Sequence, residues 1–363
     1  MTHRDIRRHI GQLAIVGFDG RSVPPALRAI AREFDLAGVI LFARNVESPP
    51  QVADLAAGVG TLARELPLWV SVDQEGGRVA RLRSPFTEWP PMAALGRAAD
   101  EQLAARFARA LAAELRAVGV TMDYAPVLDV HTNPANPVIG DRALSTRASD
   151  VARLGRAIIT ALQSAGIAAC GKHFPGHGDT SVDSHHALPV VEHPPERLRE
   201  VELVPFRAAV EAGVASIMTA HLLVPAVDEE RPVALSPALI EGWLRRDLGY
   251  EGLVLSDDLG MRAISDRYGA PEAAVAAISA GCDCVLLCGP DVDQHAIVLE
   301  ALIRAVEQKR LPVKRVEDAM ARQRRAKERF LSGAREAHAL RGWREVIGCD
   351  EHQAIAREMA GYL

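Results

Sequence analysis

The sequence predicts a (β/α)8 barrel of the α/β class, and three observations support this prediction. Eight short apolar segments recur between residues 12 and 289 and alternate with amphipathic helical patterns. Most of these segments are continuous apolar runs, as expected for parallel strands that are covered on both faces. Polar side chains gather where the segments end, which is the face on which barrel enzymes carry their chemistry. A doubly wound open sheet is the structural alternative.

The expected strands follow a repeated pattern, in which a helix-like stretch ends in glycine and an apolar run begins. Glycine fits this position because a helix commonly ends in a left-handed residue, a conformation that costs glycine little. Five glycines stand there: Gly38, Gly119, Gly166, Gly213 and Gly281. The expected strands are residues 12–18, 39–45, 67–75, 120–129, 167–173, 214–221, 252–258 and 282–289.

Amphipathic patterns predict helices between and after these strands. They lie at residues 50–66, 101–118, 149–165, 195–212, 291–308 and 313–331. Beyond Gly333 the chain has a turn near Gly348 and a last helical pattern at residues 352–360. No linker or low-complexity segment interrupts the sequence. We therefore expect a catalytic barrel at residues 1–333 and a short helical extension at residues 334–363 that packs on it.

The composition narrows the class of protein. The chain has 363 residues, of which 48% are apolar and 25% are charged, with a formal net charge of -5. It therefore lacks both the basic excess of a nucleic-acid binder and the low hydrophobicity of a disordered chain. No apolar run approaches the roughly 18 residues of a membrane span, and the first one is too short for a secretory signal. We expect a cytoplasmic protein without nucleic-acid or membrane partners.

The five cysteines are expected to be buried free thiols. They form an odd set, and three of them fall in one strand-like segment with spacing that is poor for a zinc site. Free cysteine behaves in a protein core as a small apolar residue. The five are Cys170, Cys282, Cys284, Cys288 and Cys349.

The densest cluster of titratable side chains lies at residues 171–189, GKHFPGHGDTSVDSHHALP, directly after an apolar segment. It holds four histidines, two aspartates and one lysine. Core packing does not explain them, because each would cost several kcal/mol if it were buried unpaired. Clusters of this kind mark functional sites. The alternative interpretation is a solvated polar loop without a function. Gly176 and Gly178 predict that this loop moves.

Two adjacent carboxylates, Asp257 and Asp258, end the seventh expected strand. Neighbouring residues of an extended chain point to opposite sides, so both cannot face the same reacting atom. We therefore expect one of them to be catalytic and the other to be structural. The structural role is assigned to Asp258, as the cap of the following helix.

Charged residues also surround a glycine pair at residues 72–83, VDQEGGRVARLR, where the backbone can approach a ligand closely. The residues that flank this pair are Asp73, Glu75, Arg78 and Arg81. A further loop at residues 136–145, NPVIGDRALS, offers Arg142 beside Asp141. A salt bridge between these two neighbours is the alternative to a ligand-binding role for Arg142.

Four of these segments, taken together and in this order, resemble the family 3 glycoside hydrolases over about residues 10–330. They are SVDQEGGRVARL, IGDRALS, KHFPGHGDTSVDSHHALP and LVLSDDLGM. Within that family the resemblance is to the bacterial β-N-acetylhexosaminidases of the NagZ type. It implies removal of terminal β-linked N-acetylglucosamine, with retention of configuration, from cell-wall fragments inside a bacterial cell. It implies no cofactor and no metal.

The resemblance also implies roles for single residues. Asp257 is the implied nucleophile, and Asp183 with His185 is the implied acid/base dyad. Chemistry agrees, because a histidine can shuttle the proton of a leaving oxygen near neutral pH if a carboxylate fixes its tautomer. The implied sugar-binding residues are Asp73, Arg81, Arg142, Lys172 and His173. A serine that many relatives carry after SDDL is Gly260 here.

Parts of the sequence are also compatible with three other functions. The histidines and aspartates of residues 171–189 could build a metal-dependent hydrolase, but neither H-x-H at the end of the first strand nor H-E-x-x-H is present. A non-enzymatic sugar-binding barrel needs neither Asp257 as a nucleophile nor His185 as a proton shuttle. A phosphorylase stays open, because a neutral histidine does not repel phosphate as a carboxylate would.

Overall fold

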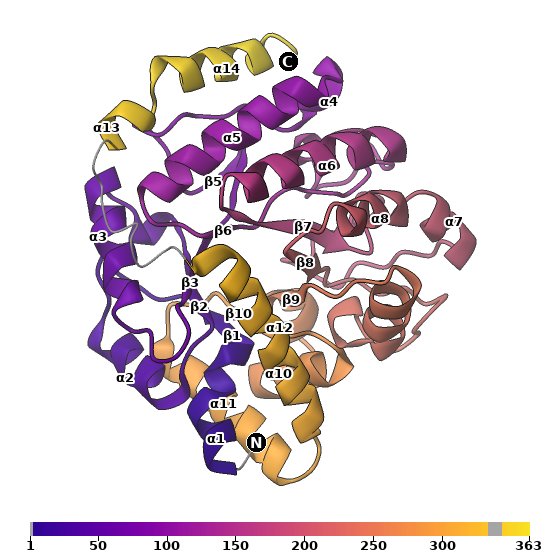
Figure 1. Ribbon diagram of the computed structural model, residues 1–363. Coiled ribbons are helices and arrows are strands. Elements are labelled where there is room, and N and C mark those ends of the chain that lie inside the picture. The colour runs from indigo at the N-terminus through magenta and orange to yellow at the C-terminus, as the bar shows by residue number, and fades with distance from the viewer. Residues whose placement is uncertain (1–2, 333–342) are drawn as a thin grey trace.

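The computed structural model describes residues 3–332 and 343–363, and in this part of the chain eight parallel strands close into a barrel (Figure 1). Apart from one inserted hairpin, strands that are consecutive in the chain are neighbours in the barrel, and β10 pairs with β1 to close it. The predicted (β/α)8 fold and all eight predicted strands are confirmed. The strands are β1 (Ala14–Val16), β2 (Gly38–Leu41), β3 (Trp69–Val72), β6 (Met122–Asp123), β7 (Ala168–Phe174), β8 (Ser216–Thr219), β9 (Leu253–Asp258) and β10 (Cys284–Leu287).

Helices surround the barrel and cover the outer faces of its strands (Figure 1). A π-helix at Ala238–Asp247 lies between β8 and β9 in the chain. The α-helices are α1 (His3–His9), α2 (Pro25–Phe34), α3 (Pro49–Gly60), α4 (Ala93–Ala98), α5 (Glu101–Ala117), α6 (Ala148–Ser164), α7 (Pro195–Glu200), α8 (Leu203–Glu211), α9 (Arg262–Ser265), α10 (Ala270–Ala280), α11 (Val292–Glu307), α12 (Val313–Leu331), α13 (Trp343–Val346) and α14 (Asp350–Ala360).

The helix predicted at residues 195–212 is wrong in one respect, because it is divided into α7 and α8. Pro205 explains the division. Proline lacks a backbone N–H and is tolerated only in the first turn of a helix. A helix that contains Pro205 must therefore begin close before it, and α8 begins at Leu203.

A short antiparallel hairpin follows β3 and was not predicted. Its strands are β4 (Gln74–Gly76) and β5 (Val79–Ala80). Gly76 and Gly77 have φ angles of 106° and 59°, which favour glycine, so the glycine pair forms the turn. The hairpin folds the chain back so that Arg81 returns to the carboxylate of Asp73.

Side chains fill the inside of the barrel, as in other packed barrels of this type. Alternate residues of a strand point inward, so Leu253 and Leu255 of β9 lie in this inner cluster while Val254 packs outward against the helices. All five cysteines are free, as predicted. Three are buried, whereas Cys288 and Cys349 are only partly buried. No helix in the described ranges is both long enough and apolar enough to cross a membrane.

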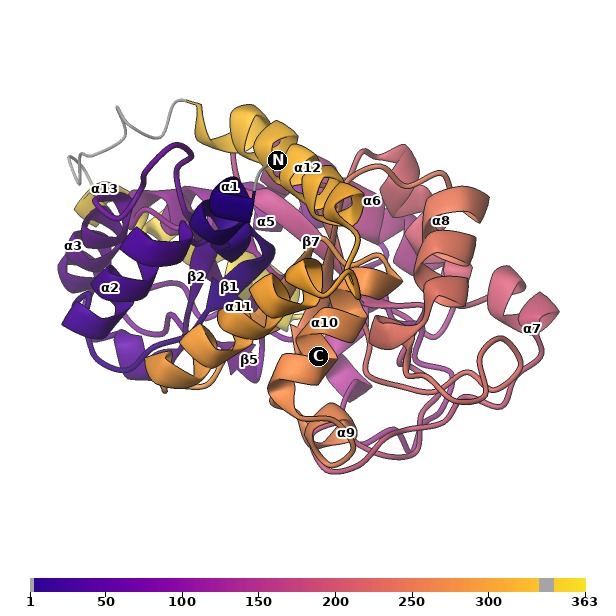
Figure 2. The same cartoon turned by 90° about the horizontal axis from the view of Figure 1, so that it is seen from below.

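Helix α12 covers the end of the barrel at which the strands begin, and it crosses the near side of the molecule in Figure 1. Gln323 Oε1 accepts a hydrogen bond of 3.0 Å from Trp69 Nε1, at the start of β3. Lys327 Nζ donates to Gln12 Oε1 at 2.8 Å. Burial lowers the pKa of Lys327 to about 7. Helix α12 therefore covers this end of the barrel and lies along the upper edge of the molecule in Figure 2, so the opposite end is the face on which a ligand is expected.

The last helix, α14, packs beside α4 and α5 (Figure 1). A buried carboxylate on α5, Glu114, joins the two regions. It accepts hydrogen bonds from Gly348 N at 3.0 Å and from Thr87 Oγ1 at 2.6 Å, and its Oε1 lies 2.8 Å from His352 Nδ1. The boundary predicted between residues 333 and 334 lies outside the described residues.

We expect Glu114→Ala to lower the free energy of unfolding by about 3 kcal/mol, because it leaves buried donors without an acceptor. Urea denaturation would measure the loss. Gln102→Ala is a matched control, since Gln102 is an exposed residue of the same helix and should cost less than about 0.5 kcal/mol. Equal losses in the two variants would contradict the role of Glu114.

Candidate active site

Lys172 is the buried cation at the centre of the open end of the barrel. It lies in β7, and its Nζ is 2.8 Å from Asp73 Oδ1 and 2.6 Å from Glu75 Oε1, both of which follow β3. Burial alone would lower the pKa of Lys172. The attraction of the two carboxylates outweighs burial and holds that pKa above its usual range. Lys172 is therefore a fixed ammonium group.

Two arginines complete this charged network. Arg142 binds Glu75 through two hydrogen bonds, from Nε to Oε2 at 2.9 Å and from a terminal nitrogen to Oε1 at 2.8 Å. Burial raises the pKa of Glu75, but Arg142 and Lys172 outweigh burial and lower it far below its usual range. Arg81 lies 3.3 Å from Asp73 Oδ2. The network thus holds these charged groups in place before any ligand arrives.

A buried carboxylate orients His173. Asp129 Oδ2 lies 2.7 Å from His173 Nδ1, while its Oδ1 accepts hydrogen bonds from the backbone nitrogens of His173 at 3.2 Å and His177 at 2.6 Å. Burial alone would raise the pKa of Asp129, but His173 and the other donors lower it. Because Nδ1 is engaged by Asp129, Nε2 is the ring nitrogen of His173 that can face a ligand.

The two carboxylates at the end of β9 have different surroundings. Asp257 Oδ1 accepts a hydrogen bond of 2.8 Å from the backbone nitrogen of Asp258. Asp258 Oδ1 turns away to accept from the backbone nitrogens of Gly260 at 3.1 Å and Cys288 at 3.0 Å. His221 Nε2 lies 3.0 Å from the carbonyl oxygen of Asp258. Asp258 therefore ties β9 to the end of β10.

Asp183 and His185 form a close pair in the loop after β7. Asp183 Oδ1 accepts from the backbone nitrogen of His185 at 2.9 Å and lies 2.8 Å from His185 Nδ1. The partial burial of Asp183 raises its pKa, but these two contacts outweigh burial and lower it. The carboxylate is thus ionised at neutral pH, and it leaves Nε2 of the ring available for a proton transfer.

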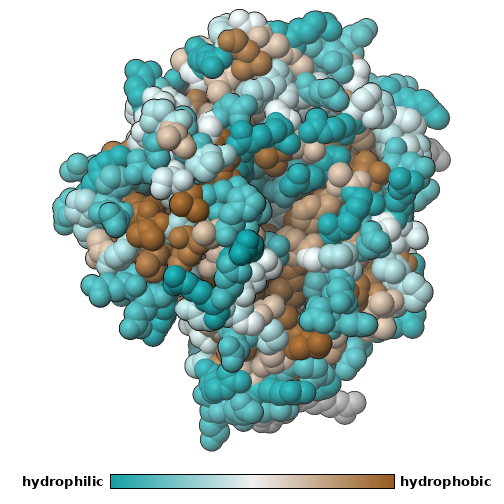
Figure 3. Space-filling model, turned by 180° about the vertical axis from the view of Figure 1, so that it is seen from behind, coloured by the Kyte–Doolittle hydropathy of each residue, from teal (hydrophilic) through white to brown (hydrophobic). Residues whose placement is uncertain are grey.

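These side chains meet at one cavity of about 130 Å³. It opens on the face opposite α12, where Figure 3 shows a hollow near the centre of the molecule. Of the predicted site residues, Asp183 alone does not line it, although it holds His185, which does. The lining residues are Asp73, Glu75, Val79, Arg81, Val138, Ile139, Arg142, Lys172, His173, His177, Ser184, His185, Met218 and Asp257.

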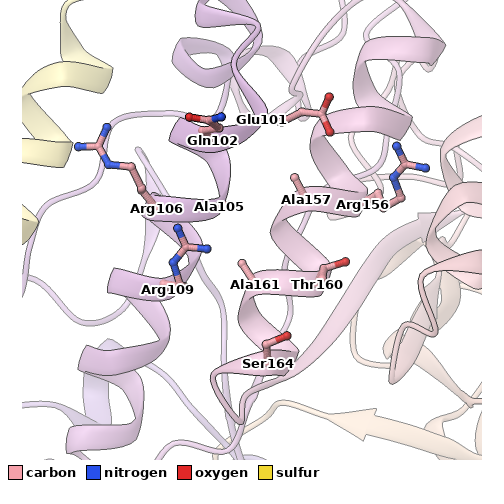
Figure 4. A pocket seen from close by; sticks show the side chains of 10 residues that line it. All are labelled: Glu101, Gln102, Ala105, Arg106, Arg109, Arg156, Ala157, Thr160, Ala161 and Ser164. Atoms are coloured by element: carbon pink, nitrogen blue, oxygen red, sulfur yellow. The ribbon is translucent and has the colours of Figure 1, made fainter.

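A larger hollow of about 590 Å³ lies outside the barrel, between α5 and α6 (Figure 4). Alanines form its floor, and long side chains such as Arg106, Arg109 and Arg156 stand at its rim. None of the predicted site residues lines it. Barrel enzymes carry their chemistry at the carboxyl ends of the strands, so the smaller cavity is the candidate active site despite its size.

Comparison with known families identifies the chain. The model of the glycosyl hydrolase family 3 N-terminal domain matches residues 5–326. The chain belongs to glycosyl hydrolase family 3. The family that the four sequence segments predict is therefore confirmed, and this protein is a glycoside hydrolase.

Several relatives of this family 3 hydrolase are informative. A β-hexosaminidase of Thiobacillus denitrificans is 44% identical over 259 residues, or 70% of this chain and 71% of that protein. A family 3 β-N-acetylglucosaminidase from a Paenibacillus species is 41% identical with a TM-score of 0.91, covering 98% of this chain and 68% of that one. NagZ from Neisseria gonorrhoeae is 31% identical with a TM-score of 0.80, covering 96% and 97%. A second structure of that NagZ contains N-trifluoroacetyl-D-glucosamine.

Two sequence-based expectations about this hydrolase need correction. Asp258 does not cap the following helix, because α9 begins after Met261 and has no side-chain cap. Its carboxylate instead accepts hydrogen bonds from the backbone nitrogens of Gly260 and Cys288. Asp141 does not pair with its neighbour Arg142 either. It lies 3.0 Å from Arg78, while Arg142 turns to Glu75.

Sequence reasoning left several cavity residues without a role. Glu75 lines the cavity and Asp129 lies behind it on His173. Their partners come from other parts of the chain, so these pairs form only when the barrel closes. In the sequence, Met218 is one apolar residue of a predicted strand. Ser184, between Asp183 and His185, gave no separate signal. Among the residues that the structure covers, no three His, Cys, Asp or Glu side chains form a group that could hold a metal ion.

Proposed function

We propose that this family 3 hydrolase is a retaining exo-β-N-acetylglucosaminidase that removes terminal non-reducing N-acetylglucosamine. The convergence of Asp257 and His185 on one cavity carries the proposal, because a retaining glycosidase needs a nucleophile and a proton shuttle on the same sugar. The gonococcal relative that is bound to an N-acylated glucosamine supports this choice of sugar.

The charged network supplies the binding side of the proposal. Arg81, Arg142, Lys172 and His173 present donors to the cavity, and Asp73 presents acceptors. Sugar hydroxyls both donate and accept hydrogen bonds, and an acetamide adds one carbonyl acceptor and one N–H donor. Because the network is fixed by its own salt bridges, little ordering is needed when the sugar binds.

In the first step, the carboxylate of Asp257 attacks the anomeric carbon while His185 Nε2–H gives its proton to the leaving oxygen. The bond from carbon to that oxygen breaks, and a covalent glycosyl-enzyme forms. In the second step, neutral His185 takes a proton from water, and the oxygen of that water displaces Asp257. Two displacements restore the β configuration. Asp183 stabilises the histidine whenever its ring carries both protons.

The proposed substrate is an N-acetylglucosaminyl fragment of the bacterial cell wall, processed in the cytoplasm during cell-wall recycling. The NagZ-type segments of the sequence support this choice, together with the match to NagZ over nearly the whole of both chains. The side chains packed inside the barrel close the inner side of the cavity, so we propose that only a terminal sugar enters it. That sugar would come from the non-reducing end, because Asp257 attacks the anomeric carbon of the sugar in the cavity and the rest of the substrate leaves.

The proposal predicts that kcat/KM for an aryl N-acetyl-β-glucosaminide is about 100-fold higher than for the aryl β-glucoside with the same leaving group. The glucoside lacks the acetamide, so polar groups of the site that bind the acetamide would be left unpaired. Initial rates on both substrates measure this ratio. Equal turnover of the two sugars would overturn the choice of N-acetylglucosamine.

Phosphorolysis is the second candidate function. A carboxylate that served as the proton shuttle would repel phosphate, whereas the neutral histidine proposed for that role does not. The same assay in the presence and absence of phosphate separates the two reactions. We expect free N-acetylglucosamine in both conditions. Formation of N-acetylglucosamine 1-phosphate would show that phosphate replaces water in the second step.

A further inference from the structure

Ser184 is the inward-facing residue of the segment that carries the Asp183 and His185 pair. It is 3% exposed, whereas the side chains of its two neighbours are 24% and 61% exposed. Its carbonyl oxygen accepts a hydrogen bond of 3.1 Å from Ala263 N, at the start of α9. Its hydroxyl oxygen lies 3.2 Å from Nε2 of His177. The segment is therefore attached to the barrel through Ser184 on both sides.

His177 is held firmly enough to serve as an anchor. Its backbone nitrogen donates to Asp129 at 2.6 Å, and its ring Nδ1 lies 2.7 Å from the hydroxyl of Thr180. Asn136 in turn donates to the carbonyl oxygen of His177 at 2.8 Å. Asp129 is the residue that orients His173, so one buried carboxylate supports both the sugar-binding histidine and the anchor.

Both ring nitrogens of His177 can be satisfied without a charge. Burial lowers the pKa of His177 to about 4, against the opposing attraction of Asp129, so the ring is neutral near pH 7. A neutral imidazole has one donor and one acceptor nitrogen. The hydroxyl of Thr180 donates its proton to the carbonyl oxygen of His177 at 3.0 Å, so Nδ1–H donates to Thr180 and Nε2 accepts from the hydroxyl of Ser184. The ring therefore binds Ser184 without competing with His185 as an acid.

The loop glycines fit this arrangement. A Cβ atom on Gly178 would lie 1.8 Å from the carbonyl oxygen of Val130, so the loop touches the backbone of the segment that follows β6. Gly176 has a φ of 136°, and a Cβ there would lie 2.9 Å from the side chain of Glu202. Close packing thus explains these glycines and brings His177 next to the barrel.

We propose that His177 and Ser184 are positioning residues, which hold the segment of Asp183 and His185 in the geometry that directs His185 into the cavity. This inference rests on the proposed function, because it assigns His185 the proton transfer. The path from the sugar site to the proton shuttle then runs from Asp129 to His177, to Ser184 and to the dyad. Neither positioning residue exchanges a proton with the substrate.

The proposal predicts an effect that depends on the leaving group. A sugar alkoxide needs its proton in the transition state, so any loss of His185 positioning slows its departure, whereas an activated phenolate leaves almost unaided. For Ser184→Ala we expect kcat/KM on an N-acetylglucosaminyl disaccharide to fall about tenfold, the scale of one hydrogen bond. On an activated aryl N-acetylglucosaminide we expect it to change by less than about twofold.

Ser181→Ala is the matched control, because Ser181 is an exposed serine three residues away in the same loop. We expect it to match the parent enzyme on both substrates. In a double-mutant cycle, His177→Phe combined with Ser184→Ala should lose little more than His177→Phe alone, because both changes remove one shared contact. Equal losses on the two substrates, or fully additive losses in the cycle, would overturn the positioning role.

The same assays separate this inference from the proposed function. If the parent enzyme fails to release N-acetylglucosamine from either substrate, the proposed function fails. If the parent is active and His185→Ala shows the dependence on the leaving group but Ser184→Ala does not, only the positioning role fails. Circular dichroism and the unfolding temperature of each variant show whether the fold is intact.

Discussion

Replacement of Asp257 by alanine is expected to reduce the turnover of an N-acetylglucosaminide by roughly 10⁴-fold or more, the scale on which enzymes lose activity with their nucleophile. The fold should survive, because within residues 3–332 and 343–363 the carboxylate of Asp257 accepts a single hydrogen bond, from the adjacent backbone nitrogen of Asp258. Steady-state kinetics with an activated aryl substrate would measure the loss. Circular dichroism would verify the fold.

The space left by the carboxylate in Asp257→Ala allows a sharper test of Asp257 as the nucleophile. Azide can enter from the face on which the carboxylate would attack, and a single displacement by azide gives an α-glycosyl azide. We expect azide to restore turnover of an activated aryl substrate by Asp257→Ala and to yield that α product, identified by NMR. A β-glycosyl azide would contradict attack from the side of Asp257.

Asp258→Asn is the matched control for Asp257→Ala. The amide oxygen of asparagine can still accept the hydrogen bonds that Gly260 N and Cys288 N donate to Asp258. Burial raises the pKa of Asp258, because it disfavours the charged carboxylate. We expect turnover within about tenfold of the parent enzyme. A glycosyl-enzyme trapped on Asp258 and mapped by mass spectrometry would reverse the assignment of the two carboxylates.

Parts of the fold could be predicted because their signals are local. Most strands of the barrel are continuous apolar runs, and such a run shows in any short window. Four of the eight also follow a glycine with a positive φ near the end of a helix, namely Gly119, Gly166, Gly213 and Gly281. The division between α7 and α8 was also present locally, at Pro205, but the amphipathic pattern continues across it. The hairpin of β4 and β5 consists of strands of three and two residues, which are too short for periodicity to reveal.

The site could be predicted only in part, for a different reason. Strand order places Asp73, Lys172 and Asp257 at one end of the barrel, so their gathering follows from the fold class alone. Which charge pairs with which depends on distances across the barrel. Arg142 therefore binds Glu75 rather than the adjacent Asp141, and Asp258 binds backbone nitrogens rather than capping α9. Sequence neighbours are a poor guide to such pairs.

His185→Ala is expected to show the dependence on the leaving group in its strongest form. General acid assistance is worth about 10²–10⁴-fold, and a sugar alkoxide needs all of it. We expect kcat/KM on a disaccharide to fall by that factor, and kcat/KM on an activated aryl N-acetylglucosaminide to change little. For the aryl substrate kcat should still fall, because the second step has lost its base. KM should then fall with it as the glycosyl-enzyme accumulates.

The neighbouring residues provide the controls for His185→Ala. His186 is an adjacent exposed histidine, so His186→Ala should leave both substrates unaffected. Asp183→Asn should give a weaker version of the loss in His185→Ala, because it disturbs the tautomer and basicity of the imidazole but leaves the ring in place. Equal losses on the disaccharide and on the aryl substrate in His185→Ala would mean that this histidine binds the sugar or holds the loop. The proton would then have to come from another side chain that faces the cavity.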